Sequence, residues 1–192
     1  SDGEQVTTMM PLPNDEDNPP DLMFATRSGN VRRNPLSDFS NVKANGKIAM
    51  KLINGDSLVG VVPCKENDDI LLSASQGKCM RFRSNDVRLF KGRGSVGVRG
   101  IRLKIDDYVI SISVLKHIEA DTDVKTLYLK AATAKRRGED QEYIEEEKFE
   151  SMHIDDQFIL TISENGFGKR TSAYEYRITN RGGQGIINIE TS

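Results

Sequence analysis

The sequence LMFATRSGNVRR occupies residues 22–33, and two similar stretches follow it: ILLSASQGKCMR at residues 70–81 and FILTISENGFGKR at residues 158–170. Each stretch joins a short apolar run to a run that contains Lys or Arg, and a glycine separates the two runs. Gly29, Gly77 and Gly166 stand where a tight hairpin turn requires a positive φ, which glycine adopts without steric cost. Each stretch therefore predicts a β-hairpin.

Each predicted hairpin is followed by a polar stretch, a glycine-rich bend and another apolar segment. Third strands are predicted at residues 46–52 (GKIAMKL), 97–103 (GVRGIRL) and 182–189 (GGQGIINI). Fourth strands are predicted at residues 57–62 (SLVGVV) and 108–114 (YVISISV), each after a turn. The opening residues 5–10 (QVTTMM) match the same slot, so residues 1–13 are expected to hold the last strand of a preceding unit.

The spacing of the hairpins indicates four-stranded modules in tandem. Gly29 and Gly77 are 48 residues apart, a length that suits one blade of a propeller-like array. Gly77 and Gly166 are 89 residues apart, and the surplus coincides with a charged insertion. We therefore predict an all-β array of four-stranded blades at residues 21–64, 69–115 and 157–192, interrupted by a helical and acidic insertion at residues 116–156.

The insertion combines a helical pattern with an acidic tract. Residues 124–137 are rich in helix formers, carry apolar residues at helical spacing, and precede Gly138, which can end a helix. A short helix is therefore predicted there. Glu145, Glu146 and Glu147 are predicted to lie in a mobile loop, which is either a solvated surface or a regulator that competes for the basic residues of the blades.

The net charge of −2 hides a strong segregation along the chain. Residues 21–104 carry 16 basic and 7 acidic side chains, whereas residues 105–156 carry 7 basic and 14 acidic ones. A body with a net charge of +9 favours a polyanion as its partner. The basic candidates lie around each hairpin and its following bend: Arg32, Arg33, Lys43, Lys47, Lys51, Lys78, Arg81, Arg83, Arg88, Lys91, Arg93, Arg99, Arg102, Lys169, Arg170 and Arg181.

No catalytic or metal site is evident in the sequence. Cys64 and Cys79 belong to no C-x-x-C pair and are predicted to be buried, and His117 and His153 are predicted to lie at the surface. Phosphate-binding and hydrolase motifs do not occur. No apolar run approaches the roughly 20 residues of a membrane helix, and residues 1–4 have no signal-peptide features. We expect a non-catalytic, cytoplasmic chain without cofactor or metal.

Several of these segments resemble the C-terminal domain of gyrase A, the A subunit of the bacterial type II topoisomerase DNA gyrase. The resemblance is carried by residues 24–33, 46–52, 97–103 and 164–171, which follow one another at blade spacing. It implies a β-pinwheel, a propeller-like disc that bends duplex DNA around its rim in support of ATP-dependent negative supercoiling. It also implies that gyrase B and a second copy of gyrase A are partners in the parent enzyme. The A subunit of topoisomerase IV is the alternative relative.

The resemblance assigns the basic candidates above to phosphate contacts, which makes binding sensitive to salt and indifferent to base sequence. The family's basic box, QRRGGKG, is not present in full, and residues 180–185 (NRGGQG) match it in part. The DNA-cleaving tyrosine of the family belongs to another domain, so no tyrosine of this chain is expected to be catalytic. The alternative function is that of a propeller-like module that binds a protein.

Overall fold

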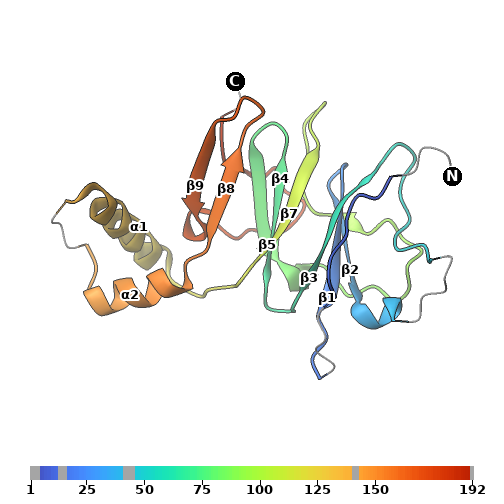
Figure 1. Cartoon of the computed structure of the whole chain (residues 1–192), viewed down its shortest axis with the longest axis horizontal. Helices are drawn as coiled ribbons and strands as arrows, with labels where there is room; N and C mark the ends of the chain where they lie inside the picture. The colour runs from blue at the N-terminus through green and yellow to red at the C-terminus, as the bar shows by residue number, and fades with distance from the viewer. Residues whose placement is uncertain (1–4, 13–16, 41–45, 140–142, 191–192) are drawn as a thin grey trace. The chain divides into compact units, whose positions relative to one another are not determined.

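The computed structural model describes residues 5–12, 17–40, 46–139 and 143–190, and its strands form two four-stranded antiparallel sheets and a hairpin (Figure 1). The chain divides into two units. The first, here called the blade unit, runs to Leu115 and resumes at Ile178; the second, the insertion unit, is Lys116–Arg177. No helix of the described ranges is long and apolar enough to cross a membrane.

The first sheet combines the first repeat with a strand from the second. β1 (Asp21–Thr26) and β2 (Asn30–Pro35) form the predicted hairpin, and β3 (Leu58–Cys64) pairs with β1. β6 (Val98–Arg99) comes from the segment predicted to be the third strand of the second blade, but it pairs with β2. The strand order is therefore β3-β1-β2-β6.

The second sheet repeats this arrangement. β4 (Asp69–Ala74) and β5 (Lys78–Arg83) form the hairpin, and β7 (Val109–Leu115) pairs with β4. β10 (Ile186–Ile187), from the last repeat, pairs with β5. Each blade thus takes its outer strand from the following repeat. The separate final blade predicted at residues 157–192 is divided accordingly, because its end completes the second sheet.

Two predicted strands are not formed. Residues 46–52 and 5–10 have no strand assignment. β6 and β10 each pair with the hairpin of the repeat before them, and the described residues before β1 contain no hairpin with which residues 46–52 could pair. A short 3-10 helix begins the segment after each hairpin: η1 (Leu36–Phe39), η2 (Ser84–Asp86) and η3 (Ala173–Glu175).

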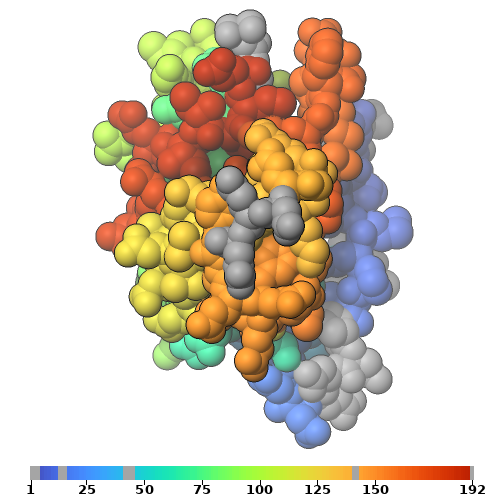
Figure 2. All heavy atoms as spheres, turned by 90° about the vertical axis from the view of Figure 1, so that its left-hand side faces the viewer, coloured from blue at the N-terminus to red at the C-terminus, as the bar shows by residue number. Residues whose placement is uncertain are grey.

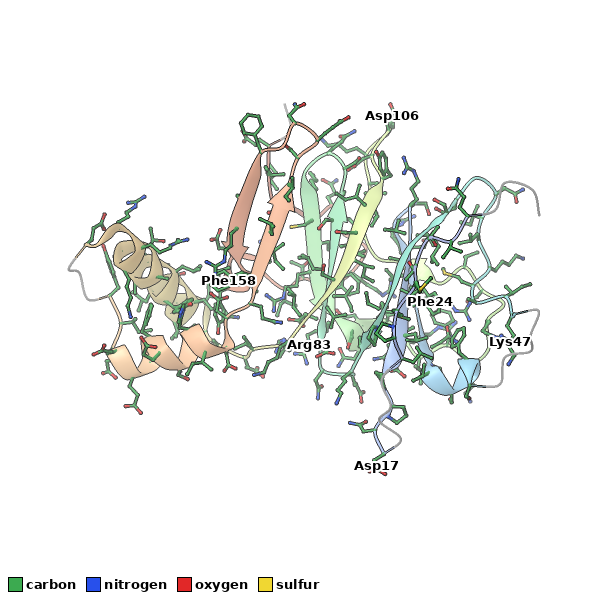
Figure 3. The ribbon with its side chains drawn as sticks, viewed as in Figure 1. Asp17, Phe24, Lys47, Arg83, Asp106 and Phe158 are labelled. Carbon is green, nitrogen blue, oxygen red and sulfur yellow. The ribbon has the colours of Figure 1, made fainter. Side chains whose placement is uncertain are left out.

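The core of the blade unit is formed by side chains from both sheets. Met23 and Val31 from the first hairpin pack with Leu72 and Phe82 from the second. Phe24 points to the other face of β1, where it packs with Leu22 and Met50 (Figure 3). Because successive strand residues face opposite sides, one apolar hairpin supplies both clusters.

Cys64 and Cys79 are both buried, as predicted. Burial is the largest cause that raises the pKa of the Cys64 thiol, to about 12. This cysteine therefore remains a protonated, unreactive core residue at neutral pH.

Two glycines allow the exchanged strands to approach their neighbours. Gly97 precedes β6 with a φ of 82°, and a Cβ placed there would overlap the carbonyl oxygen of Val31. Gly185 precedes β10 with a φ of 70°, and its Cβ would overlap the carbonyl oxygen of Cys79. Both positions need glycine for conformation and for space.

The insertion unit contains two helices and the last hairpin. α1 (Thr122–Arg137) confirms the predicted helix and ends at Gly138 in the left-handed conformation. α2 (Glu146–Asp155) occupies the predicted acidic loop, so that prediction was wrong. Glu146 and Glu147 lie in the first turn of α2, where carboxylates interact favourably with the helix dipole. β8 (Phe158–Ile162) and β9 (Gly168–Ser172) complete the unit.

Aromatic side chains hold α1 and α2 together, and Figure 2 shows the two helices side by side in yellow and orange. The ring centroids of Tyr128 and Phe149 are 5.3 Å apart, and those of Tyr128 and Tyr174 are 5.1 Å apart. His153 is exposed, as predicted, and stacks on Phe149, whereas His117 is half-buried. The insertion unit therefore has an aromatic core of its own.

Candidate nucleic-acid interface

Three of the arginines predicted to contact DNA lie inside the blade unit. Arg32, Arg33 and Arg81 expose 0%, 7% and 6% of their surface. Arg33 Nε lies 3.7 Å from a carboxylate oxygen of Asp21, and Asp69 accepts from Arg81 Nε at 2.9 Å and pairs with Nη2 at 2.7 Å. The surface role predicted for these three residues does not agree with their burial, because a guanidinium enclosed by protein cannot touch a phosphate.

Arg32 is a backbone anchor. Its Nη1 donates to the carbonyl oxygens of Arg93 at 2.7 Å and Ser95 at 3.0 Å, and its Nη2 donates to that of Gly92. Burial is the main cause that lowers the pKa of Arg32 from its ordinary value.

The segment held in this way, residues 87–99, is here called the first strap. Its backbone follows β2: Phe90 N donates to the Arg33 carbonyl at 2.8 Å, and Asn34 Nδ2 donates to the Phe90 carbonyl at 3.1 Å. The second strap, residues 178–187, follows β5 in the same manner, since Thr179 N donates to the Arg81 carbonyl at 2.9 Å. The straps end in β6 and β10, so the outer edge of each hairpin is covered.

The straps present cations to solvent. Arg88, Lys91 and Arg99 are exposed on the first strap, where Arg93 is half-buried; Arg102 is exposed just beyond it, and Arg181 is half-buried on the second strap. Stacking orients one of them, since the Arg88 guanidinium lies 4.1 Å from the centroid of the Phe90 ring. The candidates of the first strap therefore lie on backbone that Arg32 and Asn34 hold in place.

Hydrogen bonds connect the second strap to the first strap and to the residues beside it. Arg181 Nη1 donates to the Arg99 carbonyl at 3.0 Å, and its Nε donates to the Asp86 carbonyl at 2.9 Å. Arg102 N donates to the Gly183 carbonyl at 2.7 Å. Arg181 also belongs to the partial glycine-rich box, so this motif joins cations of consecutive repeats.

The other predicted residues lie elsewhere. Lys47 (Figure 3) and Lys51 are exposed on residues 46–52, and Lys43 lies outside the described residues. Lys78 and Arg83 are half-buried on β5, and Arg83 Nε lies 3.5 Å from a carboxylate oxygen of Asp69. Lys169 and Arg170 are exposed on β9 in the insertion unit.

Sequence reasoning missed the exposed cations Arg27, Lys65 and Lys104. The Arg27 guanidinium lies 3.3 Å from the centroid of the Tyr108 ring, next to the first hairpin turn. Its position directly before Ser28 and Gly29 was the available signal, because turns at the ends of blades are exposed.

The three repeats of this chain are matched by a known sequence family. The model of the DNA gyrase C-terminal domain, a beta-propeller, matches residues 20–65, 68–116 and 157–192. The chain belongs to this family. The three matched blocks of the gyrase C-terminal domain cover the three repeats, and the gap between the last two contains α1 and α2.

Relatives agree with this assignment. The A subunit of DNA gyrase from Granulibacter bethesdensis is 46% identical over 98% of this chain, and that from Rickettsia bellii is 47% identical over 97%. The chain spans 23% and 22% of the length of these relatives.

Two solved structures show the fold. The C-terminal domain of DNA topoisomerase IV has a TM-score of 0.64 at 19% identity, over 91% of this chain and 42% of that one. The DNA gyrase A C-terminal domain has a TM-score of 0.60 at 23% identity, over 86% and 42%. The expected β-pinwheel fold and the resemblance to gyrase A are thus confirmed.

Proposed function

We propose that this gyrase C-terminal chain binds duplex DNA along its two straps. The observation that carries the proposal is the hydrogen bond from Arg181 on the second strap to the backbone of Arg99 on the first. It brings the second strap against the backbone of Arg99, so that cations of two consecutive repeats lie on adjoining segments. Duplex DNA carries a negative charge about every 1.7 Å along its axis, so a continuous row of cations is its electrostatic complement.

The strap cations are available for this purpose. Within the described part of the chain, none of Arg88, Lys91, Arg99 and Arg102 forms an ion pair with a carboxylate. A phosphate would therefore break no internal pair on binding. Arg33 and Arg81 differ, because each faces a buried or half-buried aspartate.

In the parent enzyme this binding would bend DNA around the blades, in the bacterial cytoplasm, together with gyrase B and a second copy of gyrase A. Bending 20–30 base pairs costs on the order of 1–6 kcal/mol, so several blades must contribute contacts together. The bent segment would then support ATP-dependent negative supercoiling. We expect these cations to contact the phosphate backbone, so that binding depends little on base sequence.

Fluorescence anisotropy with a duplex of about 30 base pairs, between 50 and 200 mM salt, tests the proposal. Each phosphate contact contributes about 0.9 to the slope of log K against log salt, so Arg99→Gln and Arg102→Gln should each lower the slope by about that amount. Lys130→Gln, an exposed cation on α1, is the control with an equal change of charge. Absence of duplex binding at the lowest salt would overturn the proposal and favour a protein partner.

Wrapping is tested separately from binding. Relaxed plasmid is closed by ligase in the presence of the protein, and its linking number is then measured. A changed linking number supports wrapping. Binding with an unchanged linking number would show that this chain binds DNA without wrapping it.

A further inference from the structure

The insertion unit contains a cavity of about 210 Å³ that the proposed DNA binding does not use. It lies where α1 and α2 meet the hairpin β8–β9, near Phe158 (Figure 3). Tyr128, Leu129, Ala132 and Phe149 give it an apolar and largely aromatic wall. Tyr128 is fully buried and Phe149 is 7% exposed, so this wall is part of the fixed core of the unit.

Two arginines line the cavity and are held by neighbouring groups. The Arg170 guanidinium lies 3.5 Å from the centroid of the Phe158 ring, which fixes its plane and leaves the donors at its edge unused. Arg136 is tied to its own helix, since Nε donates to the Ala132 carbonyl at 3.3 Å and Nη2 to Thr133 Oγ1 at 3.2 Å. Both arginines are exposed, and within the described residues neither forms an ion pair.

The carboxylate of Asp156, which also lines the cavity, already accepts two hydrogen bonds. The Tyr128 hydroxyl donates to Asp156 Oδ2 at 2.9 Å, and Ser172 Oγ donates to Asp156 Oδ1 at 2.8 Å. Burial, together with this contact to Asp156, raises the pKa of Tyr128 well above its ordinary value, so the hydroxyl remains a donor at neutral pH. Glu175 is the other acidic residue of the wall, and Lys135 pairs with Glu150 at 3.1 Å.

We propose that this cavity binds a small planar aromatic anion. One ring would enter between Phe149 and Phe158, and its carboxylate or phosphate would meet Arg136 and Arg170. Sites for drug-sized ligands measure about 300–1,000 Å³, so the smaller volume here suits a ligand with a single ring system. Aromatic walls favour offset or edge-on contacts with such a ring, and guanidinium groups bind planar anions with two parallel hydrogen bonds.

Two sources share this chemistry, a free aromatic acid and a nucleotide. The ¹⁵N-labelled chain is titrated with indole-3-acetate for the first and with adenosine monophosphate for the second, and amide shifts are followed by NMR. Tryptamine supplies a similar ring with a positive charge, and acetate supplies the anion without a ring. We expect saturable shifts at residues of the cavity wall with at least one aromatic anion, and none with tryptamine or acetate. The tighter of the two aromatic anions identifies the source.

Variants connect the binding to the cavity. Arg170→Gln and Arg136→Gln should each weaken the better probe by about tenfold or more, the effect of losing a charge-assisted hydrogen bond. Lys130→Gln, an exposed cation of α1 that does not line the cavity, should leave binding unchanged. Ala132→Phe should block binding, because its ring would occupy the space.

Three outcomes would overturn the proposal. They are no shift with either aromatic anion at millimolar concentration, equal binding of tryptamine, or binding that both arginine variants retain. If Ala132→Phe disturbs the fold of the unit, the double variant Arg136→Gln/Arg170→Gln decides alone, because both side chains are exposed. None of these readouts uses DNA, so they do not depend on the proposed function of the straps.

Discussion

Arg33, Arg81 and Arg170 occupy equivalent places in the three hairpins, and their neighbours give them different roles. Asp21 pairs with Arg33 across the first hairpin, and Asp69 pairs with Arg81 across the second. The corresponding residue of the third repeat is Phe158, which lies opposite Ser172 as Asp69 lies opposite Arg83, and Arg170 is exposed and stacks on its ring. The sequence shows three similar basic strands, but the first residue of the paired apolar strand, Asp or Phe, distinguishes the two buried arginines from the exposed one.

Substitution of these arginines should therefore have unequal effects on stability. Arg81→Gln removes the guanidinium that lies 2.7 Å from the carboxylate of Asp69, which is 0% exposed, whereas Arg83 lies 3.5 Å from it. Loss of one partner of a buried pair costs about 3 kcal/mol or more, whereas Arg170→Gln should change the free energy of unfolding by less than about 0.5 kcal/mol. Urea unfolding of both variants measures the difference. Similar losses in the two variants would contradict the assignment of roles.

The turn carboxylate Asp56 predicts a pH dependence. Burial acts to raise its pKa, but hydrogen bonds, chiefly from Ser28, outweigh burial and lower the pKa below its ordinary value. Ser28 Oγ donates at 2.6 Å, and the amides of Ser28 and Ser57 donate at 2.9 Å. A lowered pKa in the folded state stabilises the fold above the unfolded pKa of about 3.9 and loses this effect as pH falls through the folded pKa.

Asp56→Asn should accordingly be less stable than the parent by about 1 kcal/mol at neutral pH. The difference in the free energy of unfolding should narrow as the pH is lowered below about 4, because the Asp56 carboxylate becomes protonated and its charge no longer stabilises the fold. Urea unfolding of both proteins at neutral pH and at about pH 3 measures this. A gap of the same size at both values would show that the charge of Asp56 is not involved.

The strands of each hairpin follow from local sequence, but the exchanged strands do not. Short apolar runs, basic runs and the turn glycines between them were sufficient to predict β1, β2, β4 and β5 and their pairing. The pairing of β6 with β2 depends on a tertiary approach at Gly97, which local patterns do not encode. α2 was missed because a run of glutamates was interpreted by its charge, although its first turn is a favourable place for carboxylates.

Gly97→Ala should prevent this approach. The added Cβ meets the Val31 carbonyl, and alanine also adopts a φ of 82° at a cost of about 1 kcal/mol or more. We expect faster amide exchange in residues 98–101 and weaker duplex binding. Gly94→Ala is the matched control on the same strap, because a Cβ there has no neighbouring atom within 4 Å. Unchanged exchange in Gly97→Ala would refute the requirement for glycine.

Arg32→Lys tests the anchoring of the first strap. Lysine keeps the positive charge but cannot reach three carbonyls with a planar fork. If Arg32 positions the strap, duplex affinity should fall by about tenfold while the salt slope is retained, since the surface cations remain. Full affinity in Arg32→Lys would instead show that charge alone matters at this position.

Across the whole molecule, the division of charge matches the division into units. The basic residues 21–104 form most of the blade unit, and the acidic residues 105–156 contain both helices of the insertion unit. The predicted helix of the insertion is present as α1, but the acidic tract is not a mobile loop, because α2 packs on α1 in a buried cluster of Tyr128, Phe149, Met152 and Tyr174. Composition predicted the charge of this segment, whereas the buried cluster brings together residues that are distant in the sequence.

Separate cores predict separate stabilities. Tyr128→Ala removes a fully buried ring that contacts Phe149 and Tyr174, which costs about 3–5 kcal/mol. Amide exchange should therefore accelerate throughout α1 and α2 and stay unchanged in β1, β2, β4 and β5. Tyr128→Phe keeps the ring but loses the hydrogen bond to Asp156, so it should cost only about 1 kcal/mol. If Tyr128→Ala accelerated exchange equally in the blades, the two cores would unfold as one, and the insertion would be part of the same cooperative fold as the straps.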